Sequence, residues 1–190
     1  MSSPETKRRA PLLPVLLTLA ATVLLGGCFR PLYATSATGT SVHDELATVD
    51  VASMPNVAGQ ERLSHYLRNE LVFQLNGGAP AMTKRYRLEM TSSESVQTAI
   101  VNSQTGNAES ATLNGTAHFT VRPIAGGDPI VNATATASAS YDRNPQRFAS
   151  IRAAREAEIL VAKQLAEQIK TRLAALFASG ALKGGSVASR

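Results

Sequence analysis

The chain contains no tryptophan, and only 5% of its 190 residues are aromatic. It also has a single cysteine, Cys28, so no disulfide can form within the chain. Aromatic side chains supply large buried areas in protein cores, and disulfides reinforce small secreted domains. Since both are scarce, stability must come from the packing of aliphatic side chains, and strands rich in Ala, Ser and Thr predict a thinly packed sheet surface.

The chain also lacks the motifs of common catalytic, metal and nucleotide sites. Its three histidines, His43, His65 and His118, do not occur in a metal-ligand spacing, and exposed or edge positions account for them. No nucleophile elbow, phosphate-binding loop or dinucleotide-binding fingerprint is present. We therefore expect no enzyme activity, no metal ion and no cofactor other than a covalent lipid.

The N-terminus has the organisation of a secretory signal. The basic residues Lys7-Arg8-Arg9 precede an uncharged apolar run from Leu12 to Leu25. This run is shorter than the roughly 20 residues that span a membrane. Gly26-Gly27 then precede Cys28, as at a bacterial lipoprotein cleavage site. We predict removal of residues 1–27 and acylation of Cys28; a core cysteine beside a membrane helix is the alternative, but it leaves the two glycines unexplained.

The predicted lipid anchor also indicates a compartment. Acyl chains contribute about 0.8 kcal/mol per buried CH₂, so a triacylated Cys28 would hold the protein on a membrane permanently. Phe29, and not Asp, follows Cys28. By the sorting convention of many Gram-negative bacteria, this favours the outer membrane, with the domain facing the periplasm.

Removal of the signal leaves 163 of the 190 residues, enough for one domain. They carry 16 Lys and Arg against 13 Asp and Glu, and no basic cluster is interleaved with aromatics. This charge is below that of typical nucleic-acid binders, so we expect no nucleic-acid partner. We predict a lipidated N-terminus and tether over 28–41, a single domain over 42–179 and a flexible tail over 180–190.

Hydrophobic periodicity predicts an α+β domain. Strand patterns occur at 42–51, 86–100, 111–122 and 131–141, and helical patterns at 59–76 and 148–178. Turn residues at 102–107 and 125–129 predict hairpins between the last three strands. The order β-α-β-β-β-α implies two helices packed on one face of a four-stranded, mainly antiparallel sheet.

Both helices carry clear apolar stripes. In the first, Leu63, Leu67 and Leu71 recur every four residues. The stripe of the second helix comprises Ile151, Val161, Leu165, Ile169, Leu173 and Leu176. On its outer face, Arg155 and Glu158 are spaced for an ion pair.

A basic cluster opens the second predicted strand, where Lys84, Arg85 and Arg87 occupy three of four positions. Such cations bind phosphates, Arg as a fork and Lys as a point charge, so they are candidate contacts for a phosphorylated lipid. The alternative is a solvated strand whose charges prevent edge-to-edge aggregation.

The segment Phe29-Arg30-Pro31-Leu32-Tyr33 behind Cys28 resembles the start of LPS-assembly lipoproteins of the LptE family, especially the alphaproteobacterial branch, without the glycine often found between Cys and Phe. The order of elements resembles that family too, as does the run from Tyr141-Asp142 through Arg155-Glu156-Ala157 to the long helix.

The resemblance implies a role and two partners. Family members plug a large outer-membrane β-barrel, the LPS-assembly protein, help it fold and take part in inserting lipopolysaccharide at the cell surface. Another outer-membrane accessory lipoprotein, such as an activator of a cell-wall synthase or a pilot of a secretin, is the alternative function.

Overall fold

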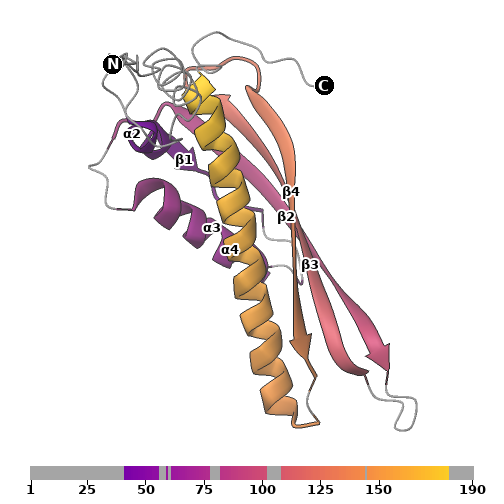
Figure 1. Cartoon of the computed structure of the whole chain (residues 1–190). Coiled ribbons are helices and arrows are strands. Elements are labelled where there is room, and N and C mark those ends of the chain that lie inside the picture. Colours follow the sequence, from indigo (N-terminus) through magenta and orange to yellow (C-terminus); the bar gives the residue numbers. More distant parts are fainter. Residues whose placement is uncertain are drawn as a thin grey trace, which may run out of the picture.

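The computed structural model describes residues 41–55, 59, 61–77, 82–101, 108–143 and 145–179. The elements follow the order α2 (Val42–Ala47), β1 (Val49–Val51), α3 (Glu61–Asn76), β2 (Tyr86–Val101), β3 (Ala108–Pro123), β4 (Val131–Asp142) and α4 (Arg147–Ser179). Figure 1 shows α4 lying lengthwise along a tall, twisted sheet, with α3 crossing the same side.

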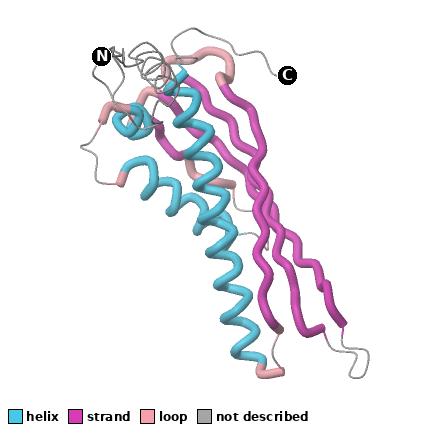
Figure 2. Tube along the Cα trace, viewed as in Figure 1, coloured by secondary structure: helices cyan, strands magenta, loops and turns pink. Residues whose placement is uncertain are grey.

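The four strands form one mixed sheet in the order β1-β2-β3-β4. Strand β1 is parallel to β2, whereas β2, β3 and β4 pair antiparallel through long, continuous registers. The predicted α+β class, with two helices on a mainly antiparallel four-stranded sheet, is therefore confirmed (Figure 2).

One predicted element is wrong: residues 42–51 do not form a single strand. Helix α2 covers Val42–Ala47 and only Val49–Val51 form a strand. The cause is a capping box, in which Ser41 and Asp44 satisfy each other's backbone N–H groups at the helix start. Ser41, the last residue of the predicted tether, thus caps a helix.

The structure describes one of the two predicted hairpin turns. Residues 102–107 lie outside the described residues, but the flanking strands β2 and β3 pair antiparallel. Between β3 and β4, Gly126 and Gly127 have φ of 97° and 122°. Residues other than glycine rarely adopt such backbone angles. The second hairpin therefore turns at the glycine pair, as the sequence predicted.

The core lies between the sheet and the helices α3 and α4. The repeat Leu63, Leu67, Leu71 and Leu75 of α3 is fully buried, which confirms the predicted stripe. Helix α4 contributes Val161, Leu165, Ile169 and Leu173, and the sheet contributes Leu88, Leu113, Phe119 and Val121. The stripe of α4 does not extend to Ile151, whose side chain is 51% exposed.

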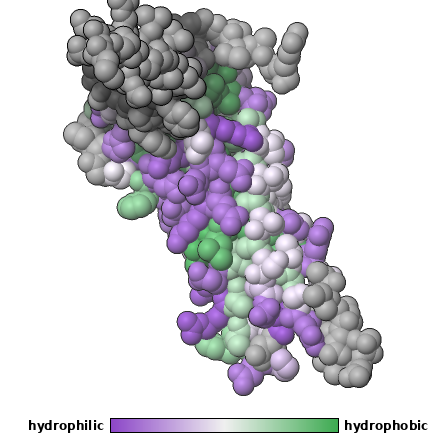
Figure 3. All heavy atoms as spheres, viewed as in Figure 1, coloured by the Kyte–Doolittle hydropathy of each residue, from purple (hydrophilic) through white to green (hydrophobic). Residues whose placement is uncertain are grey.

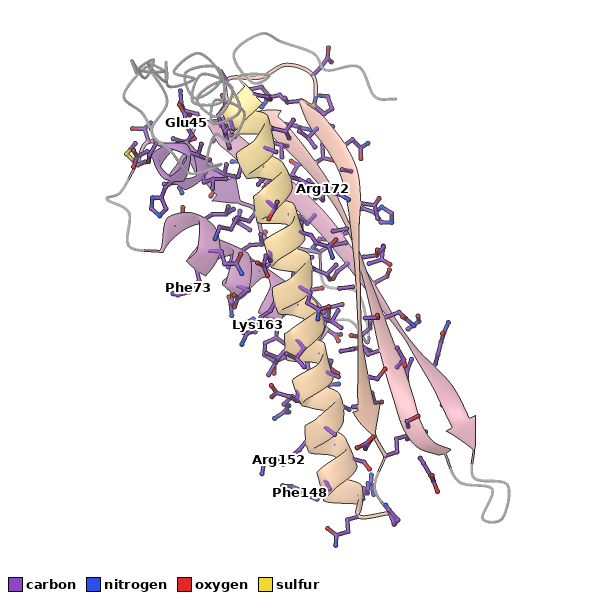
Figure 4. All side chains as sticks on the ribbon, viewed as in Figure 1. Glu45, Phe73, Phe148, Arg152, Lys163 and Arg172 are labelled. Atoms are coloured by element: carbon purple, nitrogen blue, oxygen red, sulfur yellow. The ribbon has the colours of Figure 1, made fainter. Side chains whose placement is uncertain are left out.

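The helical side carries few large apolar groups at its surface. The most exposed are Phe73 on α3 and Phe148 on α4, which Figure 4 places far apart. In Figure 3, hydrophilic side chains cover the area of α3 and separate small apolar spots. Scattered exposed hydrophobic residues of this kind are ordinary and do not indicate an interface.

Candidate functional site

Lys84 of the predicted basic cluster is fully engaged within the protein. Its Nζ donates hydrogen bonds to the backbone oxygens of Ala47 at 2.8 Å and Val49 at 3.0 Å, and to Oδ1 of Asn76 at 2.7 Å. An ammonium group has three N–H donors, and all three are used here. Lys84 therefore ties α2, β1 and the end of α3 together and has no donor left for a ligand.

Arg85 and Arg87 are more accessible. Arg85 pairs with Glu45 of α2 and lies 5.7 Å from the ring centroid of Tyr86, while Nε of Arg87 lies 3.6 Å from Asp50. Their side chains remain 51% and 53% exposed, so each guanidinium keeps N–H groups in solvent. Arg85 thus lies against α2 and Arg87 against β1, whereas Nζ of Lys84 is bound within the protein. The three cations do not converge on one ligand.

The sheet face opposite the helices is open and almost entirely polar. It carries hydroxyl and amide side chains from three strands: Thr91, Ser93, Ser95 and Gln97 of β2, Thr112, Asn114, Thr116 and Thr120 of β3, and Asn132, Thr134, Thr136, Ser138 and Ser140 of β4. Neighbouring strands hydrogen bond through these groups, for example Thr112 to Ser140 at 2.9 Å. We call this surface the open face.

Charges occur only at one end of the open face among the strand positions 87–97, 112–122 and 132–140. There Arg87 lies beside Asp50, and Arg122 lies 3.6 Å from Glu89. His118 also lies on this face, and its Nδ1 is 2.8 Å from Oγ1 of Thr134. The rest of the face is uncharged and rich in short hydroxyl side chains.

A polar cluster on the helical side was not expected from the sequence. Arg62 of α3 binds Glu158 of α4 through two hydrogen bonds of 2.9 and 2.6 Å. The side chain of Glu158 is only 6% exposed, so the predicted pair with Arg155 on the outer face is wrong for this residue. Burial, followed by the nearby charge of Glu158, raises the pKa of Glu94 on β2, and Oε2 of Glu94 is buried without a partner.

The three histidines lie apart from one another in the structure. His43 is exposed on α2 and not at a strand start, His65 is exposed on α3, and His118 lies on the open face. Within the part of the chain that the structure describes, no group of three or more His, Cys, Asp or Glu side chains is placed to hold a metal ion. Among these residues, no helix is both long and apolar enough to cross a membrane.

A family model described as LptE, lipopolysaccharide-assembly, matches residues 46–173. This range begins in α2, ends in α4 and contains all four strands. The chain belongs to the LptE family. The resemblance found in the sequence is therefore confirmed, and the role of the protein lies in lipopolysaccharide assembly. Among the curated proteins, no sequence is significantly similar to this chain.

One solved structure shares the fold of this chain, and two others are more distantly similar. A protein of Caulobacter crescentus described as a lipoprotein is 20% identical, with a TM-score of 0.56, over 73% of this chain and 96% of that chain. Rare lipoprotein B from Shewanella oneidensis is 21% identical (TM-score 0.43; 71% and 96% covered), and a minor lipoprotein from Acinetobacter baumannii is 17% identical (TM-score 0.43; 67% and 88% covered).

Several predicted features of this LptE-family chain lie outside the described residues. These are the signal over 1–27, the lipidated Cys28, the segment Phe29-Arg30-Pro31-Leu32-Tyr33 and the tail over 180–190. The matched family range lies wholly within the predicted domain over 42–179.

Proposed function

We propose that this chain is an outer-membrane lipoprotein that plugs a large β-barrel LPS translocon, assists its assembly and takes part in inserting lipopolysaccharide at the cell surface. The observation that carries this proposal is the family match over residues 46–173. Lipid on Cys28 anchors the chain, and the domain faces the periplasm.

The open face is the surface that we propose to meet the barrel. The lumen of an outer-membrane barrel is polar, and its side chains offer hydrogen bonds to an inserted domain. Thr116, Thr136 and Ser138, at the centre of the open face, present short hydroxyl groups that donate and accept such bonds. Because this region is uncharged, its contact with a polar wall carries no desolvation penalty for buried ions.

Arg85 and Arg87 are the proposed contacts for lipopolysaccharide phosphates. Both guanidinium groups remain half exposed beside carboxylates, and arginine forks suit phosphate oxygens. Lys84, the third cation of the sequence cluster, is not among these proposed contacts, because the three hydrogen bonds of its Nζ favour a framework role.

The test of the function is purification of the mature lipoprotein from outer membranes in mild detergent, followed by mass spectrometry of bound proteins and lipid. We expect one stoichiometric large β-barrel with lipopolysaccharide. The double variant Arg85→Ala/Arg87→Ala should keep the barrel and retain roughly five- to tenfold less lipopolysaccharide, since each arginine loses charge-assisted hydrogen bonds.

The matched control is Arg152→Ala/Arg155→Ala, which removes two exposed arginines from α4 and should leave bound lipid unchanged. Recovery of a cell-wall synthase or a secretin without such a barrel would replace this proposal with the alternative accessory function. Unchanged lipid in the Arg85/Arg87 variant would refute the phosphate contact alone.

A further inference from the structure

A groove of about 790 Å³ opens beside β2, where the short strand β1 ends. It extends from the edge of the sheet onto the open face. The residues that line it come from the segment after β1 and from α3, β2 and β3: Asp50, Val51, Ala52, Ser53, Pro55, Arg68, Arg87, Glu89, Met90, Thr91, His118 and Thr120.

The edge of β2 is unpaired along this groove. Strand β1 pairs only with Tyr86–Leu88, and Ala52 adds one hydrogen bond to the oxygen of Leu88. On the opposite side, Ile124 donates to the oxygen of Arg85, so odd-numbered residues of β2 bond to β3. By alternation, Met90, Ser92 and Glu94 direct their N–H and C=O groups toward the open edge. Among the described segments, no strand pairs with them there.

The other edge of the same sheet is covered. From α4, Nε2 of Gln168 donates to the oxygen of Thr136 at 2.9 Å, and Arg172 donates to the oxygen of Thr134 at 2.5 Å. Both acceptors belong to the outer strand β4, and Figure 4 labels Arg172 on α4. Exposed strand edges invite pairing with other chains, and proteins usually cover them. Within the part of the chain that the structure describes, the edge of β4 is covered and that of β2 is open beside a groove.

One cation of the groove, Arg68, forms no ion pair with any described residue. Arg87 lies 3.6 Å from Asp50, and Arg122 lies 3.6 Å from Glu89, so these charges are balanced. Arg68 lines the groove as well, and its Nε is buried without a hydrogen-bond partner. A buried donor without an acceptor is unfavourable, so an occupant with a carboxylate here gains a charge-assisted hydrogen bond.

We propose that this groove binds an extended, acidic polypeptide segment of the barrel partner, which adds a strand to the edge of β2 and places a carboxylate on Arg68. The inference rests on the proposed function, because it takes the occupant from the barrel. A polypeptide is favoured over a lipid phosphate because a row of alternating backbone donors and acceptors matches another strand.

The first experiment places a photo-crosslinking amino acid at Thr91 of the lipid-anchored protein in cells and identifies the captured peptide by mass spectrometry. We expect a single barrel segment that contains an Asp or Glu. A crosslink to lipopolysaccharide only, to a second copy of this chain, or to nothing while the barrel still co-purifies would overturn the inference and leave the proposed function standing. Loss of the barrel itself would instead refute the function.

The second experiment measures binding of a synthetic peptide of the captured segment to the purified mature protein. Arg68→Met should weaken binding at least tenfold, because one charge-assisted bond is lost. The free variant should melt no lower than the wild type, since it loses no hydrogen bond of Nε. Arg152→Met on α4 is the matched control with unchanged affinity. Equal peptide affinity of Arg68→Met and the wild type would contradict the proposal. In a charge reversal, Arg68→Glu should bind a peptide in which Lys replaces the acidic residue. Failure of this pair to bind would contradict the proposal as well.

Discussion

At the residue scale, two carboxylates lie in different degrees of burial: Glu158 is buried and Glu94 is partly buried. Glu158 and Glu94 both approach the junction of α3, α4 and β2, but Arg62 neutralises only Glu158 through two hydrogen bonds. Oε2 of Glu94 has no such partner. The pKa of Glu94 is raised, because burial and the like charge of Glu158 both disfavour its anion.

This arrangement predicts a stability that depends on pH. The pKa of Glu94 is raised in the folded protein, so its contribution is most favourable below the unfolded value and is lost as pH rises through the folded pKa. Glu94→Gln should therefore stabilise the protein at pH 8 by up to about 1 kcal/mol, since solvent screens part of the effect, and raise Tm by about 2–4 °C. At pH 4 the gain should shrink.

Thermal unfolding at the two pH values measures this difference. Glu156→Gln, which changes an exposed carboxylate on α4, is the control and should change Tm equally little at both pH values. The same gain for Glu94→Gln at pH 4 and pH 8 would refute a raised pKa.

At the element scale, the long helix and the long strands match in length. Helix α4 has 33 residues and β2 and β3 have 16 each, which corresponds to about 50 Å in both cases. Where α4 packs closely against β3, the strand needs a residue without a side chain. Gly115 of β3 provides it, since a Cβ there would lie 2.4 Å from Cγ1 of the buried Val161.

Gly115→Ala should accordingly destabilise the domain by about 1–3 kcal/mol through overpacking. The side chain of Val161 is stiff and fully buried, so it has little freedom to move away. Chemical denaturation gives the free energy of unfolding. In a Val161→Ala background the same Gly115→Ala change should cost clearly less, because the clashing methyl group is gone; equal costs in the two backgrounds would show that the contact is not the cause.

At the scale of the whole molecule, helices pack one face of the sheet, and no described element covers the other face. The open face and Arg87 lie on the uncovered side, and the groove opens at its edge. This separation leaves a large polar surface for a partner without loss of core packing. The proposed lipid on Cys28 restricts the domain to the membrane surface.

The anchor gives a prediction for the whole protein in cells. Cys28→Ser should abolish incorporation of labelled palmitate and leave the chain uncleaved or mislocalised, because no thiol remains for acylation. Thr35→Ala, within the predicted tether, is the control and should label normally. Labelling of the Cys28→Ser protein at the wild-type level would disprove the lipid attachment at this residue.

Local patterns predicted most of the elements correctly. These patterns depend only on residues that are near in sequence. They are the four-residue repeat of α3, the strict alternation along β3 and β4, and the amphipathic stripe of α4 from Val161 onward. Helix α2 was missed because its apolar residues also fit a strand, and the signal that distinguishes them is the Ser41–Asp44 capping box.

The candidate sites were less predictable. Clustering in the sequence grouped Lys84 with Arg85 and Arg87, but the fold uses Lys84 to bind backbone oxygens of Ala47 and Val49. Arg68 carried no sequence signal, since a single arginine on an amphipathic helix is usually solvated. The role that we propose for Arg68 depends on the groove, which lies where β1 ends beside β2.

Periodicity and short motifs are local, and they were enough to predict the α+β class, the main helices and strands, and the resemblance to the LptE family. The fold was needed to show that Glu158 pairs with Arg62, 96 residues away, and that, among the described residues, one sheet edge is covered and the other open. Ion pairs between distant residues and the cover of a sheet edge depend on which elements pack together. The periodicity of one element does not say which other element packs against it.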